Sequence, residues 1–333
     1  MTDDRPVLEV SDLSVSFASE QGWVRVVEEV SFSVERGKIL GIVGESGSGK
    51  SVSCLAAMGL LDSRASRVDA SSRVLLEGTD LTRLSQRQLR DVRGDRIAMI
   101  FQEPMTSLNP AFTVGNQVAE GIRAHRGVSA RQAKRRAVEL LDLVGIPDPA
   151  SIVHAYPHSL SGGMRQRVMI AMAVACEPAV LIADEPTTAL DVTVQAQILD
   201  LLRSMRDDLG LAIVFITHDL GVIADVCDDV VVMYAGKIVE RSDVDSIFET
   251  PQHPYSEGLL AAMPRLGSDK GALGIIPGRV PPPWEFPHGC RFEPRCPYSD
   301  EACGGPQVLR QVSVGHESAC GRIPDIRLEG IVS

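Results

Sequence analysis

The chain has 333 residues, 44% of them hydrophobic and 23% charged, and its formal net charge at pH 7 is −11. The length suggests about two domains, and the composition is typical of a globular protein with a hydrophobic core. The negative charge argues against a nucleic-acid-binding protein, which would carry a basic face, and the aromatic content of 4% argues against base-stacking surfaces. No apolar run approaches about 18 residues, so we expect no membrane-spanning segment and assign any membrane role to a partner.

The N-terminal segment alternates apolar and polar residues in three stretches, at residues 7–10, 13–17 and 30–34. This period of two predicts strands, and together they indicate an antiparallel β layer. An aromatic side chain of this layer could stack on an adenine ring, with Phe17 as the first candidate and Trp23 as the second. Burial of Phe17 in the core is an equally good interpretation.

Residues 44–51 read GESGSGKS and fit the phosphate-binding pattern G-x-x-x-x-G-K-S/T. An apolar strand pattern at 38–43 precedes them and a helix-like run at 52–61 follows, which is the context that this pattern needs. Glycines let the backbone wrap around phosphates with its N–H groups pointing inward, and the following helix offers its positive end. We expect Lys50 to reach the β- and γ-phosphates and Ser51 to ligate Mg²⁺. The predicted ATP-binding residues of this loop are Gly44, Glu45, Ser46, Gly47, Ser48, Gly49, Lys50 and Ser51.

The next buried strand is predicted at residues 97–101, and it delivers Gln102 at its carboxyl end. Ligand-binding residues of open α/β sheets gather at such strand ends, so Gln102 could contact Mg²⁺ or the attacking water. Taken alone, a glutamine at a strand end is more often an ordinary loop residue. The pattern then becomes helical, with amphipathic stretches at 113–124 and 130–144, and we interpret residues of about 103–165 as a helical subdomain inserted into the α/β core.

Residues 160–166 read LSGGMRQ, and their two glycines directly precede a predicted helix at 164–176. Two glycines at the start of a helix leave N–H groups accessible, which makes a second anion site. Ser161 is also a natural N-cap, and capping alone would explain the motif if it stood by itself.

Two further strands end in side chains suited to catalysis. Residues 180–186 (VLIADEP) predict a buried strand that ends in two acids. We expect Asp184 to hold Mg²⁺ through water and Glu185 to polarise the water that attacks the γ-phosphate. The strand predicted at 211–216 is followed by His218, which emerges where the γ-phosphate is expected.

In this order, the motifs resemble those of the nucleotide-binding subunits of ATP-binding cassette (ABC) transporters, over residues 7 to about 250. The resemblance implies an α/β fold with a RecA-like P-loop NTPase core, an antiparallel β subdomain and an inserted helical subdomain, in a domain spanning residues 1–250. It assigns the Walker A motif to 44–51, the Q-loop to Gln102, the signature to 160–167, the Walker B motif to 180–186, the D-loop to 189–191 and the switch histidine to His218. The catalytic set is then Glu185, His218, Lys50 and Gln102, and the Mg²⁺ ligands are Ser51, Gln102 and Asp184.

The resemblance also implies a head-to-tail dimer in which each ATP lies between two subunits. Ser161, Gly162 and Gly163 would then act on the partner's nucleotide, and Asp191 of the D-loop completes the ATP-binding set. The D-loop stretch reads Thr-Ala-Leu-Asp where the family has Ser-Ala-Leu-Asp, a departure that we expect to matter little.

Finer features resemble the oligopeptide/dipeptide importer branch, namely residues 101–110, 250–255, 258–264 and the proline-rich 276–283. The implied function is ATP hydrolysis that powers di- or oligopeptide import, at the cytoplasmic face of the membrane. The implied partners are a distinct second ATPase subunit, two permease subunits and an extracytoplasmic binding protein. The branch also serves nickel, glutathione and some antimicrobial peptides. A soluble cassette ATPase fits less well, because the chain has one cassette, no heptad pattern and a net negative charge.

Four of the seven cysteines lie in a Gly/Pro-rich extension, residues 251–333: Cys290, Cys296, Cys303 and Cys320. Because the N-terminus lacks a secretory signal pattern, these thiols suggest a metal centre rather than disulfides. Their spacing does not match a standard zinc ribbon. The resemblance implies a 4Fe–4S cluster; zinc is the alternative, no metal is a third interpretation, and His288 or His316 could replace one thiol. Such a metal would stabilise a domain with little core of its own.

Overall fold

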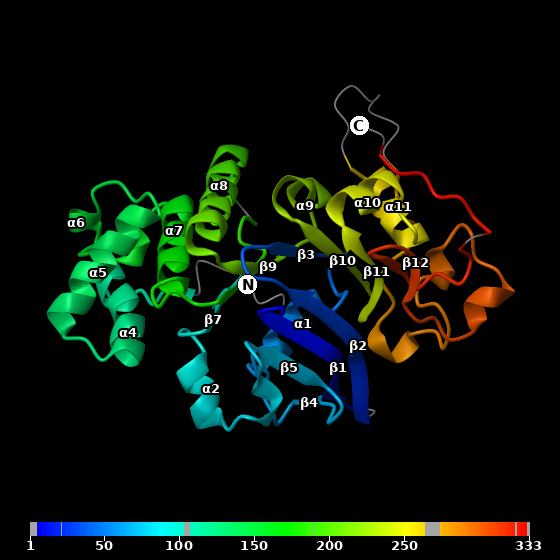
Figure 1. The fold of residues 1–333 in the computed structure, drawn as a ribbon, viewed down its shortest axis with the longest axis horizontal. Coiled ribbons are helices and arrows are strands. Elements are labelled where there is room, and N and C mark those ends of the chain that lie inside the picture. The colour runs from blue at the N-terminus through cyan, green and yellow to red at the C-terminus, as the bar shows by residue number, and fades with distance from the viewer. Residues whose placement is uncertain are drawn as a thin grey trace.

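The computed structural model describes residues 5–20, 22–102, 107–188, 190–263, 274–323 and 325–331. It contains a large sheet at the centre, a smaller antiparallel sheet below it, a group of helices on one side and the C-terminal extension on the other (Figure 1). Residues 103–106 of the predicted Q-loop segment, Ala189 of the predicted D-loop and residues 264–273 lie outside the described residues.

The large sheet has the strand order β12-β13-β11-β10-β3-β9-β8-β7. Its central strands are β3 (Ile39–Val43), β7 (Ile97–Ile100), β8 (Val180–Asp184), β9 (Ala212–Thr217) and β10 (Asp229–Tyr234). They pair in parallel, and β11 (Lys237–Asp243) then pairs antiparallel with β10. The parallel strands read as nearly continuous apolar runs because both faces of this sheet are covered.

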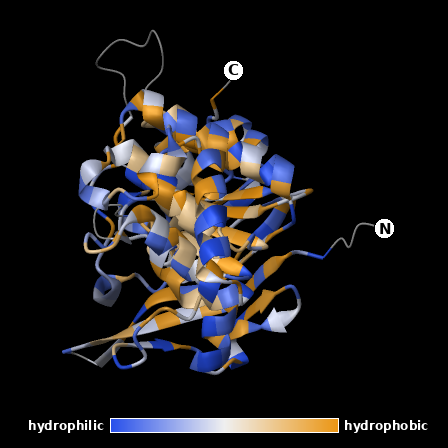
Figure 2. Ribbon diagram, turned by 90° about the vertical axis from the view of Figure 1, so that its left-hand side faces the viewer, coloured by the Kyte–Doolittle hydropathy of each residue, from blue (hydrophilic) through white to orange (hydrophobic). Residues whose placement is uncertain are grey.

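The two faces of the large sheet build two separate cores. Leu40 and Ile42 of β3 pack into the core shared with the antiparallel sheet, whereas Ile39 and Val43 pack toward the helices. This division follows from the alternation of side chains along a strand. Figure 2 shows hydrophobic residues along the strands and hydrophilic ones concentrated on the outer helices.

The predicted N-terminal β layer is confirmed as an antiparallel sheet of order β2-β1-β5-β6, with β4 also paired to β1. Its strands are β1 (Leu8–Ser19), β2 (Gly22–Val34), β4 (Ser66–Val68), β5 (Arg73–Leu76) and β6 (Thr79–Asp80). The first two predicted stretches are one strand, β1, with an irregularity in its register between Val10 and Leu13. A bulge of this kind interrupts the alternation without ending the strand.

Helices flank the sheets, and those of the predicted helical subdomain project to one side of the sheets (Figure 1). The helices up to residue 173 are α1 (Lys50–Ala57), η1 (Leu81–Arg83), α2 (Gln86–Val92), α4 (Val114–Arg126), α5 (Ala130–Leu143), α6 (Pro149–Ile152), η2 (Pro157–Ser159) and α7 (Gly162–Ala173). Helix α5 begins where Ser129 and Gln132 form a reciprocal capping box. The structure therefore starts α4 and α5 within one residue of the predicted positions.

The C-terminal extension adds two strands to the large sheet, because β13 pairs with β11 and β12 with β13. The remaining elements are α8 (Val192–Leu209), α9 (Leu220–Val226), α10 (Val244–Glu249), α11 (Pro254–Ala261), η3 (Pro283–Glu285), η4 (Glu293–Arg295), η5 (Glu301–Gly304), β12 (Arg310–Ser313) and β13 (His316–Ser318). Among the helices of the described ranges, none has the length and apolarity to cross a membrane.

Candidate nucleotide site

The phosphate-binding loop, residues 44–49, connects β3 to α1 and depends on glycine at its two ends. Gly44 has a φ of +156°, and a Cβ atom there would lie 2.1 Å from the carbonyl oxygen of Met233. Gly49 has a φ of +99° and stands directly before Lys50, the first residue of α1. The backbone can turn this sharply into the helix because neither position has to hold a side chain.

Lys50 lies buried beneath the loop, with its ammonium group turned toward loop oxygens. Nζ donates to the carbonyl oxygens of Gly44 at 2.6 Å and Glu45 at 3.0 Å. Burial lowers the pKa of Lys50, and the carboxylates of Glu185, Asp184 and Glu45 offset only part of that effect. The group is therefore a cation held close to the loop and close to two consecutive acids at the carboxyl end of β8, Asp184 and Glu185.

Ser51 and Asp184 meet at the first turn of α1. The Ser51 hydroxyl donates to Oδ1 of Asp184 at 2.9 Å. Burial raises the pKa of Asp184, and the Glu185 carboxylate adds to the rise, while the Ser51 hydrogen bond opposes it. A hydroxyl and a carboxylate are hard oxygen donors, so this pair fits a Mg²⁺ ion placed beside the phosphates.

Glu185 is the centre of a network that joins the ends of three strands. Its Oε2 accepts from Nε2 of Gln102 at 3.0 Å and from the hydroxyl of Thr188 at 2.8 Å, and its Oε1 lies 3.2 Å from Nδ1 of His218. Burial by itself raises the pKa of Glu185, but the hydrogen bonds from Thr188 and His218 and the charges of His218 and Lys50 hold it below its ordinary value. Glu185 is thus an ionised carboxylate at neutral pH.

The loop and the strand ends enclose a hollow of about 150 Å³. Its lining residues are Ser46, Gly47, Ser48, Gly49, Lys50, Ser51, Val52, Gln102 and Glu185. The structure therefore brings together the predicted phosphate loop, Gln102 and Glu185, with Asp184 and His218 in contact with them. Thr188 was missed from the sequence, because a threonine in a loop after a strand carries no signal of its own.

The two aromatic candidates for adenine stacking lie in the antiparallel sheet. Phe17 packs partly buried against the core of that sheet. Trp23 is half-exposed, and the guanidinium carbon of Arg67 lies 3.7 Å from the centroid of its ring. Neither side chain lines the hollow at the phosphate loop, and adenine stacking by Phe17 stays a prediction.

The predicted signature residues act as a helix start within this chain. The Ser161 hydroxyl accepts from the N–H of Met164 at 3.3 Å, and Gly162 and Gly163 form the first turn of α7. A Cβ atom at Gly163 would lie 2.7 Å from Cγ1 of Val194, so glycine there allows α7 to pack closely on α8. Asp191 caps α8 through the N–H of Val194 at 2.9 Å. None of these residues belongs to the lining of the hollow at the chain's own phosphate loop.

Comparison with known proteins identifies the family. Residues 27–188 match the family described as "ABC transporter", and residues 239–303 match "Oligopeptide/dipeptide transporter, C-terminal region". The dipeptide transport ATP-binding protein DppD of Escherichia coli (strain K12) is 50% identical over 315 residues, which cover 94% of this chain and 96% of that protein. The chain belongs to the oligopeptide/dipeptide branch of the ABC transporter family.

Other relatives agree with this assignment. A putative peptide import ATP-binding protein of Brucella abortus (strain 2308) is 51% identical over 95% of this chain and 94% of its own length. The dimeric bacterial ABC transporter cassette MJ0796 has a TM-score of 0.63 and 26% identity, and the match covers 71% of this chain and 98% of that one. The same cassette is known as a dimer in a post-hydrolysis state with ADP and Pi. The predicted cassette fold and ATPase activity are thereby confirmed: this ABC protein is an ATPase.

The four cysteines of the extension form no disulfides, and all seven cysteines are free thiols. The N–H of Cys290 donates to the carbonyl oxygen of Cys303 at 2.8 Å. Burial raises the pKa of Cys290 to about 11, and the proximity of Cys303, Cys296 and Cys320 adds to the rise. Among the described residues, however, no group of three or more Cys, His, Asp or Glu side chains is arranged to hold a metal ion. The predicted metal-binding character of the extension is therefore not confirmed.

His316, considered as a metal ligand in place of one thiol, instead pairs with a glutamate of the cassette. Its Nε2 lies 2.7 Å from Oε1 of Glu240, and both side chains are buried between β13 and β11. His316 thus joins the extension to the central sheet of the cassette.

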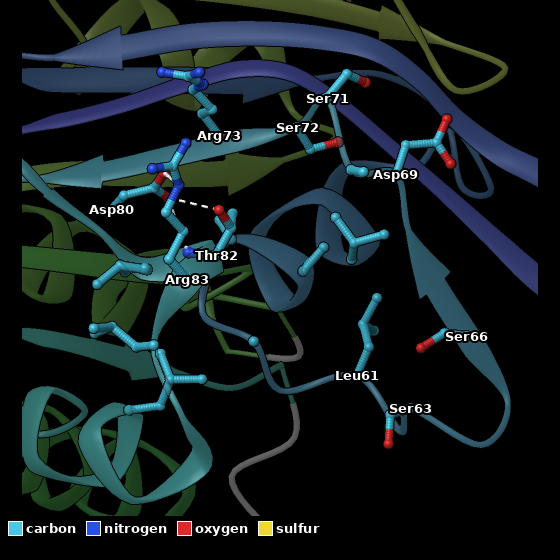
Figure 3. A pocket seen from close by; sticks show the side chains of 18 of the residues that line it. Leu61, Ser63, Ser66, Asp69, Ser71, Ser72, Arg73, Asp80, Thr82 and Arg83 are labelled. Carbon is cyan, nitrogen blue, oxygen red and sulfur yellow. Dashed lines mark hydrogen bonds and ion pairs between the residues drawn. The ribbon is translucent and has the colours of Figure 1, made fainter.

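A larger hollow of about 530 Å³ lies away from the nucleotide site, where the end of α1 faces β4, β5 and η1 (Figure 3). Its lining includes Leu61, Ser66 and Asp80. Asp80 already accepts from the N–H and the hydroxyl of Thr82 and pairs with Arg83 at 3.1 Å. Because the Asp80 carboxylate is already bonded within the chain, it is not available to capture a polar ligand in this hollow.

Proposed function

We propose that this ABC ATPase hydrolyses ATP to drive the import of di- or oligopeptides through a membrane transporter. The observation that carries the proposal is the near full-length similarity to dipeptide and peptide import ATP-binding proteins, together with the match of residues 239–303 to the C-terminal region of that branch. The chain would act as a peripheral protein at the cytoplasmic face of the membrane. Two permease subunits and an extracytoplasmic binding protein would complete the transporter.

A groove between the cassette core and the helical subdomain supports the permease partners. It has a volume of about 330 Å³ and is lined mainly by apolar side chains, including Met58, Leu60, Met99, Phe101, Met169 and Met172. Phe101 is exposed there, next to Gln102 of the nucleotide site. A groove rich in methionine suits an amphipathic helix, and we assign it to a short cytoplasmic helix of a permease.

A second ATPase subunit, distinct from this chain, would complete the nucleotide site in a head-to-tail dimer. Ser161, Gly162 and Gly163 cap a helix and do not line the hollow at the chain's own loop. Val192, directly after Asp191, is 83% exposed, which is unusual for an apolar residue beside a functional loop. Both features support a surface that another subunit covers, so that the signature acts on the partner's nucleotide.

The geometry of the site supports a division of roles in hydrolysis. Lys50 and the loop N–H groups would bind the β- and γ-phosphates, and Ser51 and Asp184 would hold Mg²⁺, with Gln102 at its edge. When bound, Mg²⁺ neutralises charge on the phosphate oxygens. Glu185 would take the proton of the attacking water, and His218 and Thr188 would orient its carboxylate.

Transport in reconstituted vesicles tests the cargo. With both permeases, the second ATPase and the binding protein present, we expect di- or oligopeptides to stimulate ATP hydrolysis and to accumulate inside the vesicles. The matched control is the same transporter with Glu185→Gln. This variant should still bind the peptide-loaded binding protein, but peptides should not accumulate inside the vesicles. If only nickel, glutathione or an antimicrobial peptide stimulated ATP hydrolysis, the transported substrate would be that other member of the branch's substrates. Failure of the chain to assemble with any permease would favour a soluble ATPase.

We propose further that Cys290, Cys296, Cys303 and Cys320 hold a 4Fe–4S cluster. Four free thiols close enough to influence one another's ionisation support this, since thiolates are the ligands of such clusters. Zinc is the alternative metal for the same four thiols, and the lack of a metal-binding group among the described side chains does not distinguish the two. When bound, the cluster would cross-link the extension.

Anaerobic purification tests the cluster. We expect brown protein containing iron and sulfide, and we expect the colour to disappear in Cys296→Ser but to persist in Cys176→Ala, which alters a buried cysteine of the helical region. Colourless wild-type protein with stoichiometric zinc would replace the cluster with a zinc site. Protein without any metal would exclude both.

A further inference from the structure

The C-terminal extension binds the phosphate loop at Glu45 through hydrogen bonds. The guanidinium of Arg295, in η4, donates through Nη1 to Oε2 of Glu45 at 2.6 Å and through Nη2 to Oε1 at 3.0 Å. The Arg295 side chain is only 5% exposed and that of Glu45 is 31% exposed. A bidentate pair between a guanidinium and a carboxylate is among the stronger hydrogen-bonded contacts in proteins, and it fixes direction as well as distance.

A second segment of the extension holds the backbone of the same residue. The hydroxyl of Tyr255, in α11, accepts from the N–H of Glu45 at 2.8 Å. The Tyr255 ring is fully buried, and its centroid lies 4.7 Å from that of Tyr234 and 5.3 Å from that of Phe292. Glu45 is therefore held at both its side chain and its main chain by groups that are themselves fixed.

Further hydrogen bonds of Arg295 fix its side chain independently of the phosphate loop. Its Nε donates to the carbonyl oxygen of Pro277 at 2.7 Å, and its Nη1 donates to the hydroxyl of Tyr234 at 3.3 Å. On the other side of the contact, the carbonyl oxygen of Glu45 accepts from Nζ of Lys50. The position of Glu45 thus links the extension to the lysine that faces the phosphates.

We propose that Arg295 is a positioning residue for ATP binding and acts through Glu45. Through this contact, the extension holds the phosphate loop in the conformation that binds the β- and γ-phosphates. Arg295 does not line the hollow at the loop, so it has no direct role toward the nucleotide. The proposal concerns the ATPase site itself and is independent of the cargo.

Arg291 allows this role to be separated from simple docking of the extension. It is also buried, and it binds the carbonyl oxygen of Ala235 and the carboxylate of Glu28. Like Arg295 it anchors the extension to the cassette, but none of its contacts is with Glu45. Loss of Arg291 therefore loosens docking without removing the contact that positions the loop.

The experiment compares Arg295→Met, Arg295→Lys and Arg291→Met as full-length chains in the assembled transporter. We expect Arg295→Met to raise the KM for ATP about tenfold and to leave kcat within about twofold, because a loop that binds ground and transition states alike has been displaced. Lysine should recover part of the loss, since its ammonium can replace only one of the two bonds. Arg291→Met should shift KM less than about twofold. An unchanged KM in Arg295→Met, or an equal rise in Arg291→Met, would overturn the proposal.

Two further measurements keep the proposal testable if Arg295→Met does not fold. Tyr255→Phe removes only the hydroxyl that accepts from Glu45 and should raise the dissociation constant of a fluorescent ATP analogue about threefold. Adding Arg295→Lys to Glu45→Gln should cost little beyond Glu45→Gln alone, because the arginine acts through that carboxylate. Wild-type affinity in Tyr255→Phe, or fully additive losses in the double variant, would contradict the assignment.

Discussion

Glu185→Gln is expected to lower ATP turnover by on the order of 10²-fold or more while ATP binding persists. The glutamine side chain has the same shape and can still bond to Gln102 and Thr188, so the site should keep its geometry. An amide, however, does not accept a proton from water. The measurement pairs steady-state hydrolysis in the assembled transporter with titration of a fluorescent ATP analogue, and the variant should accumulate as an ATP-bound dimer.

The matched control for this variant is Glu301→Gln, an exposed glutamate of η5 far along the chain from the loop. Its turnover should equal that of the wild type. Because the network around Glu185 holds the pKa of this carboxyl below its ordinary value, mild acidification from neutral pH should not protonate it. A fall of activity in that range must come from another group. Near-wild-type hydrolysis in Glu185→Gln would remove Glu185 from the role of base.

The grouping of the site could be predicted because it follows from the topology of the sheet. Gln102, Glu185 and His218 each follow a strand, and the strands β7, β8 and β9 are parallel neighbours. Their carboxyl ends meet at one edge, beside the loop that follows β3. A chemically active residue at the end of each apolar run is therefore enough to predict which side chains come together, although not which atoms bond.

The contacts of the extension could not be predicted in the same way. Arg295 and Glu45 are 250 residues apart, and neither lies in a periodic pattern that would orient it. Strands β12 and β13 are only four and three residues long, too short for alternation to be visible. The cysteines were visible as a cluster, but spacing alone specifies neither their geometry nor a metal. Long-range partners of loop residues depend on the packing of the whole chain.

Lys50→Ala is expected to weaken ATP binding about 10²-fold, which separates it from Glu185→Gln. The ammonium group donates to the carbonyl oxygens of Gly44 and Glu45 in the loop. Without it, the γ-phosphate would meet the carboxylates of Asp184 and Glu185 with one positive charge fewer. Two charge-assisted hydrogen bonds to phosphates, at roughly 1.5–3 kcal/mol each, total about 3–6 kcal/mol, so a loss of about 10²-fold lies at the lower end of that range.

Titration of the full-length chain with a fluorescent ATP analogue and Mg²⁺ measures this loss directly. Lys134→Ala provides the control, since Lys134 is exposed on α5 and its removal changes the net charge by the same amount. The control should bind with wild-type affinity, which would show that the effect is local rather than a change in the overall field. If Lys50→Ala instead bound ATP as tightly as the wild type, the loop between β3 and α1 would not be the phosphate site. The contact between Arg295 and Glu45 could then not position the loop for ATP, so Lys50→Ala also tests the premise of the role proposed for Arg295.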